Sequence, residues 1–385
     1  MDGAEWMREV RLVNARVLAP ADTGATELSM RDGIITDVAG ATSATVVDCE
    51  GDFLVPGLID LHTDNIEHHF HPRPGVTWPS ALAAALAHDA QMLLSGITTV
   101  LDSLSLGDYD SAGARTRMLH SAIGGLDEAH AAGLLRADHH FHFRCELSDG
   151  GLLPIIEEHV DNPRVRLMSM MDHTPGQRQW HDVGLYREFR RKKNNRVWDD
   201  AEWQAYLDDR LAQQARFVPE ARAIISDHGR DKQIRLASHD DTTIEDVEQS
   251  HADGISISEF PTTLVAARRA RELGQKIVMG APNVVLGGSH SGNVGAMALA
   301  AEGLLDVLTS DYVPASLLPA AFLVGHELGD LGKGLSTVTS EPAALLGFDD
   351  RGRLEPGLRA DMLQVRIVNG QPVIRGVWAA GRRFL

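Results

Sequence analysis

Cysteine is scarce in this sequence, which has Cys49 and Cys145 as its only two among 385 residues. Two cysteines cannot build a disulfide framework, so we expect a protein of the reducing cytoplasm. No uninterrupted apolar run reaches the roughly 18 residues of a membrane-spanning helix. The opening MDGAEWMREV has no basic segment followed by an apolar one, so it does not predict a signal peptide.

Positive charge is also in deficit. Lysine and arginine total 36 against 54 aspartate and glutamate residues, which gives a formal net charge of −18. A negative surface repels phosphate backbones and anionic lipids, so we expect neither nucleic acid nor membrane as a partner. Hydrophobic residues at 43% and charged residues at 23% are close to globular averages, which excludes disordered and collagen-like chains.

Two β-rich ends bracket a longer middle. Residues 1–54 and 350–385 alternate apolar and polar positions between Gly and Asp turns, which predicts short strands. In residues 55–349, apolar runs alternate with amphipathic segments such as Leu82–Leu94 and Ala112–Ala132. Eight strand–helix units of this kind predict an α/β fold, a (β/α)8 TIM-like barrel. The predicted strands are Leu54–Leu61, Ile97–Leu101, His139–Arg144, Val165–Met171, Ile234–Ala237, Gly254–Ser258, Lys276–Met279 and Asp306–Thr309.

A doubly wound open sheet would also alternate strands and helices, but it would need a phosphate loop or dinucleotide fingerprint, which we do not find. A helical insert at about 180–230 separates the fourth and fifth strands. Within it, Tyr186–Arg196 has six basic residues and one acidic residue. This segment is either a lid that gathers an anionic substrate, or a solvated helix end or oligomer contact.

Acidic residues and histidines follow the predicted strands at the end where a parallel barrel gathers its active site. His62 and Asp64 are two residues apart, so an extended backbone would point both side chains the same way. Any one of these residues could instead be a helix cap or a hydrogen-bonding group. Together they favour two divalent ions, with zinc, manganese or iron as the metals that such ligands suit. The predicted ligands are His62, Asp64, Glu146, His173, His239 and Asp311.

The run Val55–His62 resembles the first barrel strand of the amidohydrolase superfamily, and the two β-rich ends resemble its small composite β-sandwich. Most members have a second histidine where this chain has Asp64. Many also use a carboxylated lysine as bridging ligand, and none follows the first five strands here. Glu146 is the replacement that we predict, with Glu259 as its competitor.

Longer motifs are similar to one family in that superfamily, the triphosphate diphosphatases of phosphonate metabolism. This resemblance implies hydrolysis of a ribose-linked triphosphate to a 5-phosphate and pyrophosphate. It also implies that Asp311 is the catalytic residue that takes a proton from the nucleophile. The matching segments are 62–65, 72–75, 144–147, 172–179, 237–241, 259–263, 279–283, 287–293 and 310–316.

Phosphate needs positive charge and backbone N–H groups. The Gly-rich loop Gly287–Asn293 could turn amides toward an anion, although it could also be an ordinary connecting loop. Rival functions are a carbon–nitrogen hydrolase with the same metal site and an inactive barrel that serves as a scaffold. We further expect a homo-oligomer, a dimer. The predicted substrate-binding residues are Arg73, Arg178, Asn283, Ser289 and His290.

Overall fold

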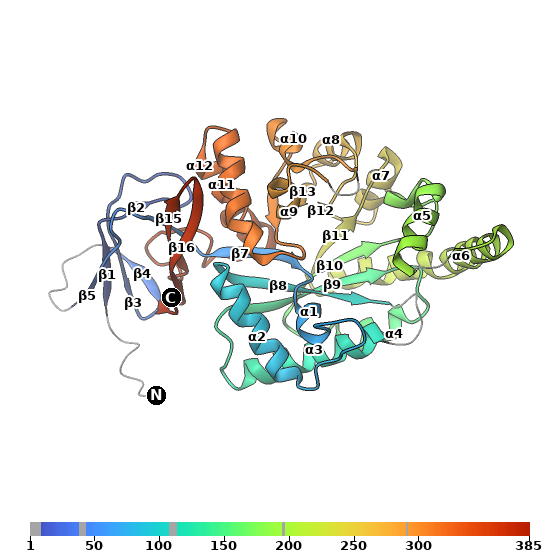
Figure 1. Ribbon diagram of the computed structural model, residues 1–385, viewed down its shortest axis with the longest axis horizontal. Coiled ribbons are helices and arrows are strands. Elements are labelled where there is room, and N and C mark those ends of the chain that lie inside the picture. Colours follow the sequence, from blue (N-terminus) through green and yellow to red (C-terminus); the bar gives the residue numbers. More distant parts are fainter. Residues whose placement is uncertain (1–8, 38–43, 108–113, 195–196, 290–291) are drawn as a thin grey trace.

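The computed structural model describes residues 9–37, 44–107, 114–194, 197–289 and 292–385. Eight parallel strands, β7 to β14, form one sheet in which each strand pairs with its neighbours in chain order. The sheet closes where Thr63 and Asp311 form a parallel bridge, so the predicted barrel is confirmed (Figure 1). The strands are β7 Leu58–Thr63, β8 Ile97–Leu106, β9 Asp138–Glu146, β10 Val165–Met171, β11 Arg235–His239, β12 Ile257–Glu259, β13 Lys276–Gly280 and β14 Val307–Thr309.

Two smaller sheets lie beside the barrel, one built from the N-terminal segment alone and the other from both ends of the chain (Figure 1). One has the order β4-β3-β1-β5 and the other β17-β16-β15-β6-β2. Leu12, Met30 and Trp378 are buried in the shared core, which confirms the composite β-sandwich. Its strands are β1 Val10–Val13, β2 Arg16–Val17, β3 Leu28–Arg31, β4 Ile34–Thr36, β5 Thr45–Asp48, β6 Phe53–Pro56, β15 Met362–Val368, β16 Gln371–Ala379 and β17 Arg382–Arg383.

The predicted strand Leu54–Leu61 is wrong as a single element, because the chain passes from one sheet to another at Gly57. Before it, β6 pairs with β15 in the small sheet, and after it, β7 pairs with β8 in the barrel. A Cβ on Gly57 would lie 2.3 Å from the Thr98 hydroxyl oxygen, so only glycine fits this crossing. Apolar character alone does not show such a change of partner.

Helices cover the outside of the barrel, and α2 and α3 agree with the predicted segments to within two residues at each end. Inside the barrel, an apolar layer including Leu61, Leu167 and Val307 lies on seven of the eight strands. The helices are α1 Ile66–Phe70, α2 Ala81–Leu94, α3 Ala114–Ala131, α4 Leu152–His159, α5 Val183–Asn194, α6 Asp200–Asp231, α7 Ile244–Ala252, α8 Leu264–Glu272, α9 Ala281–Val285, α10 Ala296–Ala301, α11 Leu317–Glu327, α12 Leu331–Ser336 and α13 Ser340–Leu346. None of those in the described residues is long and apolar enough to cross a membrane.

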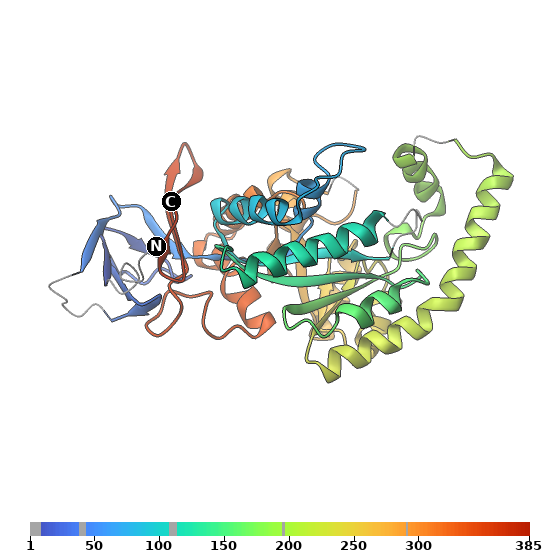
Figure 2. The same cartoon turned by 90° about the horizontal axis from the view of Figure 1, so that it is seen from below.

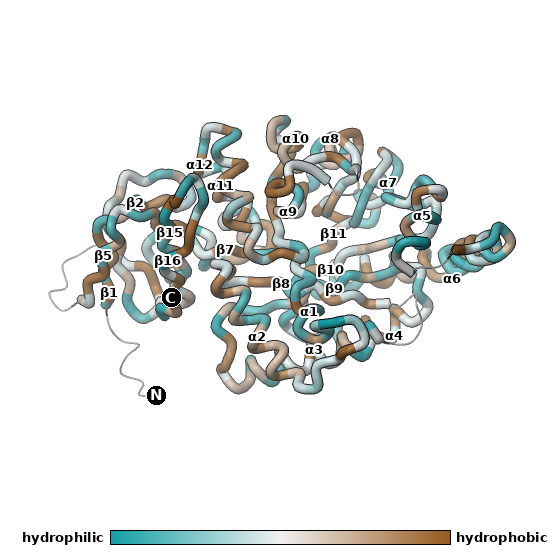
Figure 3. The backbone as a smooth tube through the Cα atoms, viewed as in Figure 1, coloured by the Kyte–Doolittle hydropathy of each residue, from teal (hydrophilic) through white to brown (hydrophobic). Residues whose placement is uncertain are grey.

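The long helix α6 runs along the barrel and projects beyond it, and α5 lies to one side of the projecting part (Figure 2). Hydrophilic and hydrophobic segments alternate along α6 (Figure 3). Ala221 and Ile225 in its second half are buried against the barrel. In its first half, the Tyr206 hydroxyl lies 2.7 Å from that of Tyr186 on α5. The projecting part of α6 therefore holds α5 in place.

Candidate active site at the barrel mouth

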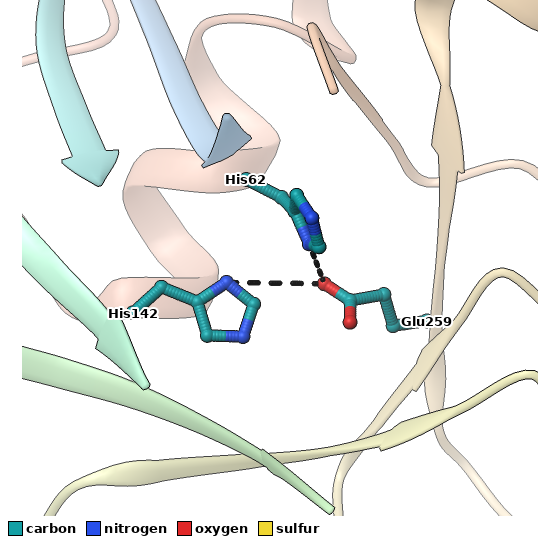
Figure 4. Close-up of side chains that lie close together, drawn as sticks. All are labelled: His62, His142 and Glu259. Carbon is teal, nitrogen blue, oxygen red and sulfur yellow. Dashed lines mark hydrogen bonds and ion pairs between the residues drawn. The ribbon is translucent and has the colours of Figure 1, made fainter. Parts of the chain in front are cut away.

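Glu259, the last residue of β12, joins two histidines at the mouth of the barrel. Its Oε1 lies 2.8 Å from His62 Nδ1, and its Oε2 lies 2.8 Å from His239 Nδ1. His142 Nδ1 is 4.0 Å from the same Oε1 (Figure 4). A carboxylate that accepts a hydrogen bond from Nδ1–H of a neutral imidazole leaves Nε2 with a lone pair, which is how metal-binding histidines are commonly held.

Glu146 holds a third histidine in the same way. Its Oε2 is 2.5 Å from His173 Nδ1, and its Oε1 accepts the His173 backbone N–H at 3.1 Å. The Nε2 atoms of His173 and His239 then lie 3.9 and 3.4 Å from one carboxylate oxygen of Asp240. These three residues form a group whose donor atoms all lie within 4.8 Å of one another.

A second group consists of His62, Asp64 and Asp311, again with donor atoms within 4.8 Å. His62 Nε2 is 3.5 Å from Asp64 Oδ1. Within the described part of the chain this buried nitrogen has no hydrogen-bond partner. A buried imidazole nitrogen between two carboxylates attracts a cation, whether a proton or a divalent metal ion, so the donors present fit the predicted metals.

The backbone at three strand ends has a conformation that non-glycine residues seldom adopt. Asp240, Phe260 and Asp311 follow β11, β12 and β14, with φ of 58°, 55° and 55°. Such left-handed residues cost free energy and persist where the surroundings hold them, often at functional sites. Here the turn directs the Asp240 carboxylate back toward His239, so that adjacent residues serve one site.

The charges around His62 favour a cation. Burial opposes protonation of His62, but Glu259 and Asp64 outweigh burial and raise its pKa to about 10. Burial lowers the pKa of His142 to about 3, so His142 stays neutral. Burial also raises the pKa of Asp311, whereas the Arg144 guanidinium and His62 lower that of Asp64 despite burial. The mouth therefore stabilises positive charge at His62 through its carboxylates.

Two cavities flank these groups. The larger, about 260 Å³, extends toward α9 and the loop that follows it, and the smaller, about 170 Å³, lies under α5. Arg144 and Gln179 line both cavities, so the cavities meet at these two side chains. A still larger cavity of about 1070 Å³ opens at the opposite end of the barrel, but its described lining residues include no histidine.

Comparison with known proteins gives a relationship over nearly the whole chain. It is 43% identical over 375 residues to the alpha-D-ribose 1-methylphosphonate 5-triphosphate diphosphatase of Escherichia coli (strain K12), covering 96% of this chain and 98% of that protein. The chain belongs to this diphosphatase family. No family model matches it.

Solved structures show that this chain has the amidohydrolase fold. It aligns with N-isopropylammelide isopropylaminohydrolase of Burkholderia multivorans at a TM-score of 0.65 and 16% identity, covering 98% of both chains. It also aligns with N-acetylglucosamine-6-phosphate deacetylase of Pasteurella multocida at a TM-score of 0.60 and 12% identity, covering 98% of this chain and 99% of the other. At these identities the likeness shows the fold alone.

The predicted substrate residues of this chain are dispersed. Asn283 and Ser289 line the larger cavity, and Asn283 Oδ1 also accepts the Ala296 N–H at 2.9 Å. Arg178 is buried, with its guanidinium in an ion pair with Asp241, and is absent from the described lining of both mouth cavities. Arg73 is exposed in a turn, and His290 lies outside the described residues.

Sequence reasoning did not select two residues that the structure places at the mouth. Arg144 lies between His142 and Glu146 on β9, and the period of two in this strand is the signal that could have found it. Its Nη1 contacts Asp64. Asp240 is next to the predicted ligand His239 in sequence, and only the left-handed backbone reveals the direction of its side chain.

Proposed function

We propose that this protein hydrolyses alpha-D-ribose 1-methylphosphonate 5-triphosphate to the 5-phosphate and pyrophosphate. The observation that carries the proposal is the relationship to the curated diphosphatase over nearly the full length of both chains. The barrel mouth supports it, because donor groups for divalent cations lie between two cavities that share one arginine. A triphosphate can cross such a site with one part in each cavity.

The proposed cofactors are two divalent ions, zinc, manganese or iron. His62, Asp64 and Asp311 would hold one ion, and His173, His239 and Asp240 the other. Glu259 and Glu146 would accept hydrogen bonds from the Nδ1 atoms of the histidines and so orient them. Glu146 is also available as a ligand. Such ions would supply Lewis acidity toward a phosphoryl oxygen and toward water.

Asp311 is the proposed proton acceptor. It lines the larger cavity beside His62, and burial raises its pKa, which strengthens it as a base. Water forms a new P–O bond at the phosphorus next to the ribose 5-oxygen, and its proton passes to Asp311. The P–O–P bond breaks, and the bridging oxygen leaves with pyrophosphate.

Arg144 is placed to stabilise the charge that develops during this step. Its guanidinium lines both cavities and contacts Asp64, so it lies where the two parts of the substrate meet. A planar guanidinium can donate two parallel hydrogen bonds to phosphate oxygens. Held in place by Asp64, it needs little reorganisation when the P–O–P bond breaks.

We also propose that the protein works as a cytoplasmic homodimer. The two cysteines are buried and unpaired, as suits a reducing compartment. Leu185, Val197 and Leu211 on and beside the projecting helices are 65%, 79% and 45% exposed, which favours self-association there. Sedimentation velocity tests the dimer, and a monomer at micromolar concentration would contradict it.

A comparison of turnover between substrates tests the proposed function. Purified protein loaded with manganese or zinc is given the ribose triphosphate, and released pyrophosphate is measured beside a panel of amides and aminopurines. The proposal predicts kcat/KM for the triphosphate above that for every carbon–nitrogen substrate. Turnover of an amide or aminopurine with none of the triphosphate would assign the protein to the rival hydrolase class.

A further inference from the structure

The smaller cavity is lined by basic residues from three different elements. Arg115 comes from the first turn of α3, Arg144 from β9 and Arg190 from α5. Arg190 is only 7% exposed, so α5 brings a guanidinium inward, close to the ring of Tyr206. Glu146, which contacts His173, is the one carboxylate among the described lining residues. Among the lining residues that the structure describes, positive charge therefore exceeds negative charge, in a protein that is strongly acidic.

The larger cavity has the opposite balance. Among its described lining residues Arg144 is the one arginine, and Asp240 and Asp311 supply carboxylates. Ser289 and Asn293 supply neutral hydrogen-bonding groups of the kind that bind sugar hydroxyls. Its volume of about 260 Å³ exceeds the 170 Å³ of the smaller cavity, so the larger part of the substrate fits there.

Aromatic rings close the smaller cavity on the α5 side. Trp180 packs against Phe189 and Tyr186, with ring centroids 4.6 and 5.2 Å apart, and all three side chains line the cavity. These rings form an apolar wall on that side, and an apolar wall strengthens attraction between guanidinium groups and an anion.

From charge, size and the shared arginine, we propose that the smaller cavity binds the pyrophosphate portion of the triphosphate, with Arg115 and Arg190 as its binding residues. The ribosyl methylphosphonate portion occupies the larger cavity, and the bond that breaks lies beside Arg144. This inference rests on the proposed function and assigns each part of its substrate to a subsite. Each of the three arginines can offer a phosphate group paired N–H donors.

The proposal is tested by equilibrium titration with each product, which requires no turnover. Arg190→Gln and Arg115→Gln are expected to weaken inorganic pyrophosphate binding about 10- to 100-fold, as loss of a charge-assisted hydrogen bond does. Both variants should bind ribose 1-methylphosphonate 5-phosphate within about twofold of wild type. The variant Asn293→Ala, in the larger cavity, should have the opposite effect. It should weaken binding of ribose 1-methylphosphonate 5-phosphate and leave pyrophosphate binding unchanged.

Arg191→Gln is the matched control, because Arg191 is the next residue on α5 and its guanidinium pairs with Glu188 on the exposed side. It should bind both products as wild type does, and circular dichroism should show every variant folded. Arg190→Lys should recover part of the lost pyrophosphate affinity. Unchanged pyrophosphate affinity in Arg190→Gln and Arg115→Gln, or weaker monophosphate binding instead, would overturn the proposal. Wild type that binds pyrophosphate but never hydrolyses the triphosphate would leave the subsite intact and refute the proposed reaction.

Discussion

Arg144 binds Asp64 across the barrel mouth, with Nη1 2.9 and 2.6 Å from the two carboxylate oxygens. The pair joins β9 to the residue that follows β7, between two cavities that both contain the guanidinium. The ion pair raises the pKa of Arg144 against the effect of burial and lowers that of Asp64. Both groups stay charged at neutral pH, so the mouth keeps a fixed positive group beside its metal donors.

Replacement of Arg144 should therefore impair catalysis more than folding. We expect Arg144→Gln to lower kcat/KM for the triphosphate about 100-fold or more, the size seen when an electrostatic donor is removed from a reaction site. Steady-state kinetics measures this, with Arg268→Gln as control, because Arg268 pairs with Glu302 at the exposed surface of α8. Activity in Arg144→Gln equal to that of the control would remove Arg144 from the mechanism.

The two glutamates should differ in their effect on metal content. Glu259 holds histidines of both donor groups, whereas Glu146 holds His173 of one group alone. We expect Glu259→Gln to lose both ions and Glu146→Gln to lose one, because a neutral amide cannot hold an Nδ1–H as a carboxylate does. Elemental analysis of the dialysed variants counts the ions. Full occupancy in Glu259→Gln would contradict this arrangement.

Replacement of Asp311 separates proton transfer from substrate binding. Asp311→Asn should lower kcat about 100- to 10,000-fold, the usual range for loss of a general base. KM should change little if the bound ions remain, which metal analysis of the same sample verifies. Because burial raises the pKa of Asp311, wild-type activity should fall as pH decreases toward that pKa. A variant with wild-type kcat would assign the proton to another group.

A buried ion network outside the barrel mouth makes stability depend on pH. His139 Nδ1 lies 2.8 Å from Asp102 Oδ2, and its Nε2 lies 3.4 Å from Asp89 Oδ1. Burial opposes the charged form, but the two carboxylates raise the pKa of His139 from 6.5 to about 9. A raised pKa stabilises the fold fully below pH 6.5, and this stabilisation is lost as pH rises through about 9.

Thermal denaturation of wild type and His139→Gln measures this contribution. The difference in Tm between the two should be largest below pH 6.5 and should shrink as pH increases beyond 9. His326→Asn, at an exposed position of α11, serves as the control and should follow wild type throughout. A difference in Tm that does not vary with pH would show that His139 contributes packing alone.

The barrel could be predicted because its signal is repeated. Val165–Met171 was predicted to the residue, and Lys276–Met279 is one residue short of β13, since buried parallel strands appear as short apolar runs. The residues at the mouth could be predicted too, because they come directly after these apolar runs in the sequence. The passage at Gly57 could not be predicted, because pairing partners leave no mark on a local pattern.

Side-chain direction was the other limit. Arg178 is near His173 in sequence, but its guanidinium pairs with Asp241 beneath the mouth. Glu146 and Glu259 were both plausible bridging ligands, and only their contacts with Nδ1 atoms show which histidines each one holds. Which partner a side chain contacts depends on its rotamer and on the turn between strand and helix. Spacing along the chain does not determine either.

The most direct test of the proposed reaction is phosphorus NMR of the metal-loaded protein with alpha-D-ribose 1-methylphosphonate 5-triphosphate in oxygen-18 water. The account predicts pyrophosphate and the 5-phosphate in equal amounts. It also predicts the label in the 5-phosphate, because the pyrophosphate held by arginine is the leaving group. Label in the pyrophosphate would contradict that assignment, and no pyrophosphate from protein with both ions bound would contradict the function itself.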